Sequence, residues 1–203
     1  PERGFVFCCF NNDHKILPAM FDIWMRLLRA VEGGVLWLLQ DNELVTRNLR
    51  REAGARGLAG ERIVFAPRTR PADHLARQRC ADLFLDTLPY NAHTTASDAL
   101  WVGLPLVTAA GSTFAGRVAA SLLASAGVPE LAAPSLAEYE TLALSLAREP
   151  ARLAALKAKI VSNRDTCPLF DTARITRNLE ALYAGMHARA QRGEAPESFA
   201  AAP

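Results

Sequence analysis

The sequence has few cysteines and no long hydrophobic run, and these absences exclude two classes of protein. Its 203 residues hold four cysteines, none of them in a CxxC pair. The adjacent Cys8 and Cys9 cannot bridge without strain, so neither a disulfide framework nor a zinc ribbon is indicated, and we expect buried, reduced thiols and a cytoplasmic location. The longest apolar stretch, residues 99–111, is too short to span a membrane and contains Gly103 and Pro105.

The sequence also lacks an excess of charge of either sign. It has 23 basic and 21 acidic side chains, a formal net charge of +2, and 50% hydrophobic residues. There is therefore no overall basic field to attract nucleic acid or an anionic membrane, and a chain of this length can bury roughly 70% of its unfolded surface. We expect an ordered globular protein whose partner is a small molecule or another protein.

Short apolar runs alternate with longer segments of helical periodicity, a pattern typical of a parallel sheet with crossover helices. We therefore predict an α/β fold with a Rossmann-like, doubly wound sheet, in which runs such as Val35–Leu39 are buried on both faces. The predicted strands are 5–10, 35–40, 63–66, 83–86, 106–109 and 131–133. The predicted helices between them are 17–31, 44–56, 72–80, 94–102 and 113–126.

After Pro134 the pattern becomes wholly helical, with predicted helices at 136–148, 151–163 and 171–191. The last helix carries one apolar stripe, which we expect to pack against another surface. Residues 194–203 are small, polar and flanked by proline, so we expect a flexible tail. The predicted organisation is one lobe, residues 1–193, with C-terminal helices at about 136–191, followed by this tail. The stripe consists of Ile175, Leu179, Leu182, Tyr183 and Met186.

Ligands of an open parallel sheet bind at the carboxyl ends of its strands, so the loops that follow the strands are the places to search. The sequence contains neither GxGxxG nor GxxxxGKS/T, the two glycine-rich phosphate motifs. The loop after the first predicted strand instead holds Asn11–Lys15, where Lys15 could bring a positive charge to a phosphate. The alternative is turn and helix-cap chemistry with a solvated lysine.

The loop after the fourth predicted strand carries a second polar pattern. Thr94 and Thr95 open a helix, where free backbone N–H groups and the positive end of the helix dipole favour an anion. Asp98 lies one turn further on the same face and could accept hydrogen bonds from sugar hydroxyls, and His93 directly precedes the pair. The alternative is a threonine N-cap with an acidic residue in the first turn.

Two further polar groups flank these loops. His74 and Arg77 lie at the start of the helix that follows loop 67–71, and His74 taken alone would be a capping or surface histidine. Asp82 and Asp86 flank a buried strand, and we interpret them as cap and turn residues, not as a catalytic pair.

Ten strings of the sequence, together with His74, point to one family when they are taken in order over about residues 5–185. They are CFN at 9–11 with KI at 15–16, VLWLL at 35–39, RIVF at 62–65, ADLFLDT at 81–87, HTT at 93–95, DALW at 98–101, GLP at 103–105, RVAAS at 117–121 and PLF at 168–170. Together they resemble the C-terminal catalytic half of the O-linked N-acetylglucosamine transferase family, and a bacterial member in particular.

The resemblance implies the second of the two Rossmann-like lobes of a GT-B glycosyltransferase, whose sugar nucleotide lies in the cleft between the lobes. By this resemblance Lys15 contacts the diphosphate and acts in catalysis, and Asp98 binds the ribose. Thr94 and Thr95, next to His93, would hold the diphosphate at the start of their helix.

The resemblance also assigns a second set of residues to the nucleotide, with loop 69–71 lining the uracil. Animal members of the family have glutamine and lysine at the positions of Asn12 and Pro71, and Arg70 could supply the missing cation. The residues of this set are Asn12, Thr69, Arg70, Pro71, His74 and Arg77.

The implied reaction is inverting transfer of N-acetylglucosamine from UDP-N-acetylglucosamine to a serine or threonine hydroxyl of a protein, with no metal or other cofactor. The base, the first lobe and helical repeats that select the acceptor would lie in a part of the protein outside this chain. Two alternatives stay open: a soluble transferase that moves glucose from UDP-glucose to asparagine, and a non-catalytic nucleotide-binding module. Neither nucleic acid nor a membrane is expected as a partner.

Overall fold

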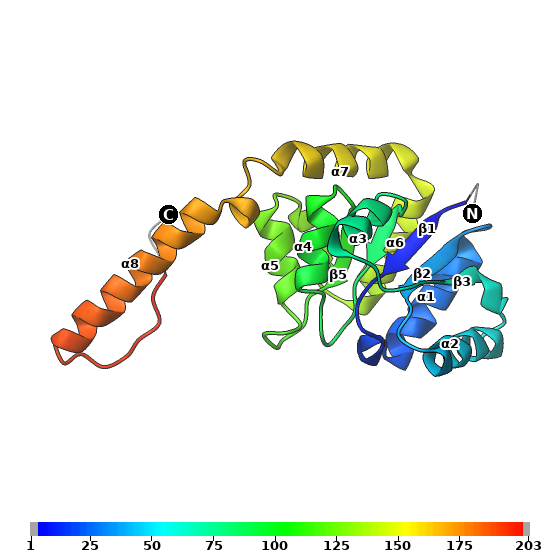
Figure 1. Ribbon diagram of the computed structural model, residues 1–203, viewed down its shortest axis with the longest axis horizontal. Coiled ribbons are helices and arrows are strands. Elements are labelled where there is room, and N and C mark those ends of the chain that lie inside the picture. Colours follow the sequence, from blue (N-terminus) through cyan, green and yellow to red (C-terminus); the bar gives the residue numbers. More distant parts are fainter. Residues whose placement is uncertain (1–3, 201–203) are drawn as a thin grey trace.

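A computed structural model describes residues 4–200, which form one parallel six-stranded sheet with helices around it (Figure 1). The strand order is β3-β2-β1-β4-β5-β6, so the chain starts in the middle of the sheet and builds outward in both directions. This order is that of a Rossmann fold, which confirms the predicted α/β class. The strands are β1 (Val6–Cys9), β2 (Val35–Leu39), β3 (Ile63–Ala66), β4 (Leu83–Leu85), β5 (Leu106–Ala109) and β6 (Ala132–Ala133).

The helices follow the strands in the alternating order that a parallel sheet requires. Pro18 begins α1, where its missing N–H costs no intrahelical hydrogen bond, and the chain leaves this helix through Gly33, whose φ is +67°. The helices are α1 (Pro18–Ala30), α2 (Glu43–Ala55), α3 (Pro71–Gln78), α4 (Thr94–Trp101), α5 (Val118–Ser125), α6 (Leu136–Arg148), α7 (Pro150–Asn163) and α8 (Thr172–Gln191).

One expectation about the sheet is wrong. Strand β2 is not buried on both faces, because Leu36 and Leu38 are buried whereas Val35, Trp37 and Leu39 are only partly covered. The less covered face opens into a hollow of about 280 Å³ lined by Val6, Val35, Trp37, Val64 and Cys80. Cys80 is accordingly exposed, while the other three cysteines are buried as expected.

The segment before α5 is a second difference from the sequence prediction. The helix begins at Val118, not at residue 113, because residues 111–116 close into a loop in which the Gly111 N–H donates to the Gly116 carbonyl at 2.6 Å. This loop is tied to the loop after β4, since the Asn91 N–H donates to the Ala115 carbonyl at 3.0 Å. A Cβ atom at Gly116 would lie 2.9 Å from the Pro89 carbonyl oxygen, so the close approach requires glycine.

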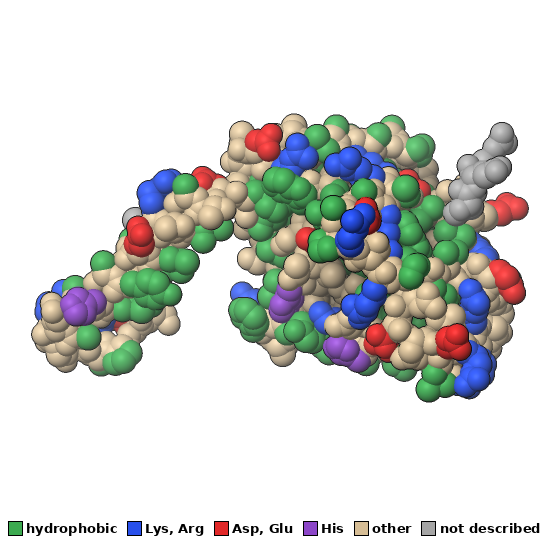
Figure 2. Space-filling model, in the orientation of Figure 1, with side chains coloured by type: hydrophobic (Ala, Val, Ile, Leu, Met, Phe, Trp, Pro, Cys, Tyr) green, Lys and Arg blue, Asp and Glu red, His purple; other side chains and the backbone are tan. Residues whose placement is uncertain are grey.

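The C-terminal helices leave the sheet in two steps (Figure 1). Helix α7 crosses one side of the globular part, and α8 then extends away from it. Within the described part of the chain no residue of α8 is buried, so the structure does not show what its stripe packs against, and that packing stays a prediction. Figure 2 shows hydrophobic side chains along the side of α8 that faces the globular part.

The tail is described as far as residue 200, and residues 201–203 lie outside the described range. It has no helix or strand from residue 194 to 200, but it returns along α8. Arg189 pairs with Glu197 at 2.6 Å, and the Phe199 ring lies against Gly185. Between residues 4 and 200, no helix is both long and apolar enough to cross a membrane.

Candidate functional site

The sheet order itself selects the position of the site. Strands β1 and β4 are neighbours at the centre, and the chain continues from them toward opposite edges of the sheet. At such a topological switch point the loops that leave the two strands separate and open a crevice at their carboxyl ends. The two loops here are residues 10–17 and 86–93, which hold both polar patterns identified in the sequence.

Asp86 organises the floor of this crevice. Its carboxylate is buried and accepts four hydrogen bonds, three at Oδ1 from the Thr87 N–H (2.7 Å), the Ala92 N–H (2.6 Å) and Asn11 Nδ2 (3.1 Å) and one at Oδ2 from Thr108 Oγ1 (2.6 Å). Burial raises the pKa of Asp86 to about 6, while the four donors favour the charged form and oppose a larger rise. The interpretation as a turn residue was incomplete, because Asp86 joins β1, β4, β5 and the α4 loop.

Asn11 extends this hydrogen-bond network to the start of α4. Its Nδ2 also donates to Thr87 Oγ1 at 2.8 Å, and its Oδ1 accepts from Thr95 Oγ1 at 2.6 Å. The first turn of α4 is therefore tied through one buried amide to the end of β1 and to Asp86. The sequence pattern placed Asn11 in a polar loop but gave no reason to single it out.

The start of α4 points free backbone donors into the crevice. The residue before the helix is His93, with φ −111° and ψ −91°, and its side chain makes no capping hydrogen bond, so a threonine N-cap is not what the structure has. The N–H groups of Thr94 and Thr95 belong to the first turn and have no intrahelical acceptor. With the positive end of the helix dipole they create a local preference for an anion.

A cavity of about 380 Å³ opens beside this helix start. Its wall brings together residues from the loops after β1 and β3 and from α3 and α4. Thr95 and Asp98 face it from α4, and seven of the eleven residues singled out in the sequence are among its lining. The lining residues are Phe10, Asn12, Leu39, Arg68, Thr69, Pro71, His74, Leu75, Arg77, Thr95 and Asp98.

Arg77 fixes the orientation of the His74 imidazole in this wall. Arg77 Nε donates to His74 Nδ1 at 3.0 Å, and because a guanidinium only donates, the neutral form of the ring carries its proton on Nε2. Burial lowers the pKa of His74, the charge of Arg77 lowers it further, and Asp98 opposes the shift. The ring also stacks edge-on against Phe10 with centroids 5.1 Å apart, which fixes its plane.

Asp98 faces His74 across the cavity from the second turn of α4. Burial raises the pKa of Asp98, and the nearby His74 partly offsets this rise. Its carboxylate has no hydrogen-bond donor among the described residues, so both oxygens can accept from a ligand.

Lys15 does not line this cavity and instead contacts the loop that leads into α4. Its Nζ donates to the Asn91 carbonyl at 3.0 Å and sits 3.7 Å from the centroid of the Tyr90 ring. Burial lowers the pKa of Lys15, and the negative charge of Asp86 opposes this shift. No local pattern marks Tyr90, because its partner lies 75 residues earlier in the chain.

Besides Lys15, three predicted site residues lie outside the cavity wall, namely Arg70, His93 and Thr94. Arg70 is 86% exposed and pairs with Asp73, because Pro71 begins α3 and leaves Arg70 outside the helix. Arg68 lines the cavity in its place, a position that the sequence did not indicate. Thr94 is exposed, and the His93 ring packs against Tyr90 with centroids 5.1 Å apart.

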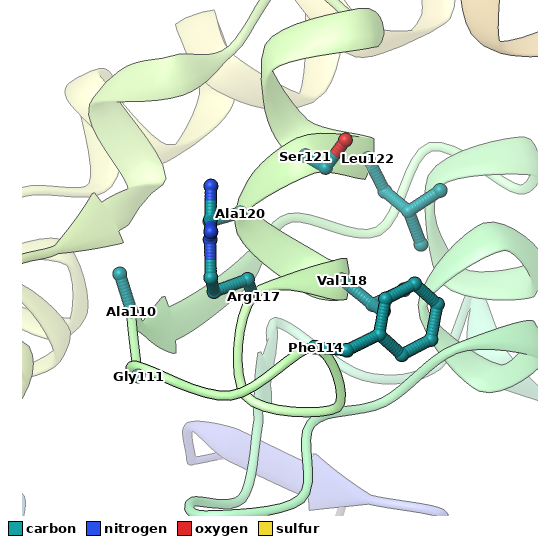
Figure 3. Close-up of a pocket in the computed structure, with 8 residues that line it drawn as sticks. All are labelled: Ala110, Gly111, Phe114, Arg117, Val118, Ala120, Ser121 and Leu122. Atoms are coloured by element: carbon teal, nitrogen blue, oxygen red, sulfur yellow. The ribbon is translucent and has the colours of Figure 1, made fainter. Parts of the chain in front are cut away.

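A second, larger hollow of about 720 Å³ lies against α5 (Figure 3). Figure 3 shows Phe114, Val118 and Leu122 on one side of the α5 start and Arg117 on another. Phe114 is 83% exposed, and its ring stands edge-on to His93 with centroids 6.3 Å apart. This hollow therefore borders the rim of the crevice on the His93 side.

Several known proteins resemble this chain over nearly its whole length. A probable UDP-N-acetylglucosamine–peptide N-acetylglucosaminyltransferase SEC of Arabidopsis thaliana is 38% identical over 200 residues, which are 98% of this chain and 20% of that protein. The UDP-N-acetylglucosamine–peptide N-acetylglucosaminyltransferase of Caenorhabditis elegans is 37% identical and is matched over 95% of this chain and 17% of its own length. The chain thus spans about a fifth of these relatives.

Solved structures agree with the sequence relatives. A mutant O-GlcNAc transferase of Thermobaculum terrenum superposes with a TM-score of 0.86 and 35% identity over 90% of this chain and 36% of that one. A sucrose-phosphate synthase of Thermosynechococcus elongatus, 19% identical with a TM-score of 0.62 over 93% of this chain and 47% of that one, shares the fold alone. The model of glycosyl transferase family 41 matches residues 1–179. The chain therefore belongs to glycosyl transferase family 41.

Proposed function

We propose that this chain is the donor-binding lobe of an inverting, metal-independent transferase that moves N-acetylglucosamine from UDP-N-acetylglucosamine to serine or threonine hydroxyls of proteins. The observation that carries the proposal is the crevice at the switch point. There Thr95 and Asp98 of α4 line one cavity with the His74–Arg77 pair, and Lys15 is hydrogen-bonded to Asn91 in the loop that leads into α4. The relatives named above are called UDP-N-acetylglucosamine–peptide N-acetylglucosaminyltransferases, which supports the donor and a peptide acceptor.

The groups of the crevice match the parts of a nucleoside diphosphate. The free N–H groups of Thr94 and Thr95 and the ammonium of Lys15 suit the diphosphate, because all are donors and carry partial or full positive charge. Asp98, which has two open acceptor oxygens, suits the hydroxyls of the ribose. Loop 69–71, with Thr69 and Pro71 in the cavity wall, lines the position of the uracil.

The reaction needs charge stabilisation at the leaving group above all. The acceptor hydroxyl attacks the anomeric carbon from the face opposite the diphosphate, the bond to the diphosphate oxygen breaks, and its electron pair leaves with that oxygen. Lys15 and the α4 start neutralise the charge that develops there, a type of contact worth about 3 kcal/mol in a transition state. The proton of the acceptor passes to a base outside this chain.

The full-length protein gives the direct test, because the donor cleft needs both lobes. Calorimetric titration should show tighter binding of UDP than of ADP or GDP. Transfer to a serine- and threonine-containing peptide should proceed from UDP-N-acetylglucosamine and not from UDP-glucose, and it should persist in EDTA. Transfer of glucose to asparagine would replace this proposal with the N-glucosyltransferase, and absence of nucleotide binding would leave a structural module.

A further inference from the structure

The ammonium of Lys15 rests on an aromatic ring that no part of the proposed donor site requires. Nζ lies 3.7 Å from the centroid of Tyr90, closer than the other cation–ring pairs of the described residues, which lie between 5.3 and 5.4 Å. Its single hydrogen-bond acceptor within residues 4–200 is the Asn91 carbonyl at 3.0 Å. A lysine side chain has four rotatable bonds, so these two contacts determine where its charge stands.

The backbone of the loop that carries Tyr90 is held by hydrogen bonds, although the side chain is 43% exposed. The Tyr90 carbonyl accepts from Thr87 Oγ1 at 2.7 Å, and Asn91 Nδ2 donates to the Thr87 carbonyl at 2.8 Å. The Tyr90 ring also packs against His93, the residue that precedes α4. The ring therefore contacts both the Lys15 ammonium and the residue before the anion-binding helix start.

We propose that Tyr90 is a positioning residue, whose ring holds the Lys15 ammonium toward the diphosphate. The effect on catalysis rests on the proposed function, whereas the contact between Tyr90 and Lys15 does not depend on it. The negative face of an aromatic ring attracts a cation without neutralising it, unlike a carboxylate partner. The ring therefore leaves two N–H groups of Lys15 free for the leaving group.

Two substitutions separate the ring from the hydroxyl. Tyr90→Phe keeps the ring and removes the phenol oxygen, whereas Tyr90→Leu removes the ring. In the ligand-free protein the ε-methylene protons of Lys15 should show an upfield ring-current shift in NMR spectra of the unmutated protein and of Tyr90→Phe, and this shift should vanish in Tyr90→Leu. An ordinary shift in the unmutated protein would overturn the inference whatever the protein does with nucleotides.

The second test measures kcat and KM of single and double variants of the full-length protein, as a double-mutant cycle. Tyr90→Leu should lower kcat about five- to tenfold with a smaller change in KM, and Tyr90→Phe should stay within about twofold of the unmutated protein. In a Lys15→Ala background Tyr90→Leu should cost less than about twofold, because the group it positions is gone. Equal losses in both backgrounds would show that Tyr90 does not act through Lys15.

The two arms distinguish failure of the inference from failure of the proposed function. If the unmutated protein neither binds UDP nor transfers sugar, the proposed function fails, while the ring-current shift still decides whether Tyr90 holds Lys15. If transfer occurs and Tyr90→Leu has unchanged kcat, the positioning role is wrong and the proposed function stands.

Discussion

Lys15 is the side chain on which the proposed chemistry depends most. Its contacts within residues 4–200 are one carbonyl and one ring, so its loss should cost the fold less than about 1 kcal/mol. Lys15→Ala should nevertheless reduce turnover by about a hundredfold, which corresponds to about 3 kcal/mol of transition-state stabilisation. Initial rates and a thermal melt on one preparation check this, and unchanged turnover would remove Lys15 from the mechanism.

Asp98 tests the ribose contact. Asp98→Asn keeps the size of the side chain and loses a charge-assisted hydrogen bond, so UDP affinity should fall by about 1.5–3 kcal/mol while the fold is kept. Asp73→Asn is the matched control, since that carboxylate lies on α3, outside the cavity, with an exposed arginine as its partner. A change in the denaturant melt with no change in affinity would make Asp98 a helix-start residue.

The raised pKa of Asp86 predicts an unusual pH dependence of the free energy of unfolding. Its pKa is about 6 in the folded protein against 3.8 for an unperturbed aspartate, so between these values the folded state binds more protons than the unfolded state. The contribution of Asp86 is therefore fully present below about pH 4 and is lost as pH rises through 6, by about 3 kcal/mol in total. Urea unfolding at pH 4 and pH 7 should show this loss relative to Asp86→Asn, and parallel curves for the two proteins would contradict it.

At the scale of elements, α8 contributes little to the lobe that precedes it. No residue of α8 is buried within the part of the chain that the structure describes. A chain that ends at Asp171 should therefore keep its melting temperature within about 2–4 °C, equivalent to about 1 kcal/mol. Leu156→Ala in α7 removes a buried side chain and should cost about 2–5 kcal/mol in the same assay. An equal loss on truncation would show that α8 packs on the lobe.

The sequence predicted elements better than it predicted contacts. The bounds of β3, β5 and α6 follow from apolar runs and helical periodicity, which are local signals. The sequence predicts helix for the loop before α5 because the hydrogen bond of Ala115 to Asn91 joins positions 24 residues apart, and such pairing leaves no local trace. Two of the four donors to Asp86, Asn11 and Thr108, likewise lie 75 and 22 residues away in the sequence, so local patterns do not indicate its network.

The same limit applied to the candidate site. The resemblance assigned Asn12 to the nucleotide, whereas Thr95 and Asp98 also followed from the pattern of a helix start after a buried strand. The observed strand order brings the loops after β1 and β4 together, and all three residues line one cavity. Arg70 and Arg68 could not be told apart, because the choice depends on where α3 begins. Tyr90 was missed because a tyrosine in a loop carries no signal until its partner is known.

At the scale of the whole molecule, we propose that this chain supplies one wall of a donor cleft. The chain spans about a fifth of its curated relatives, and no residue of α8 is buried within the described part of the chain. The isolated chain should therefore bind nucleotide more weakly than the full-length protein, and the decisive test belongs to the latter.

Amide hydrogen exchange in the full-length protein, with and without UDP, reports on the proposed diphosphate site itself. UDP should slow exchange at Thr94 and Thr95, whose N–H groups open α4 and face the proposed diphosphate position. Helix α2 connects β2 to β3 at one edge of the sheet, away from α4, which connects β4 to β5. The amides of α2 therefore serve as the internal reference and should not change. Protection confined to α8, with none at the start of α4, would contradict the account.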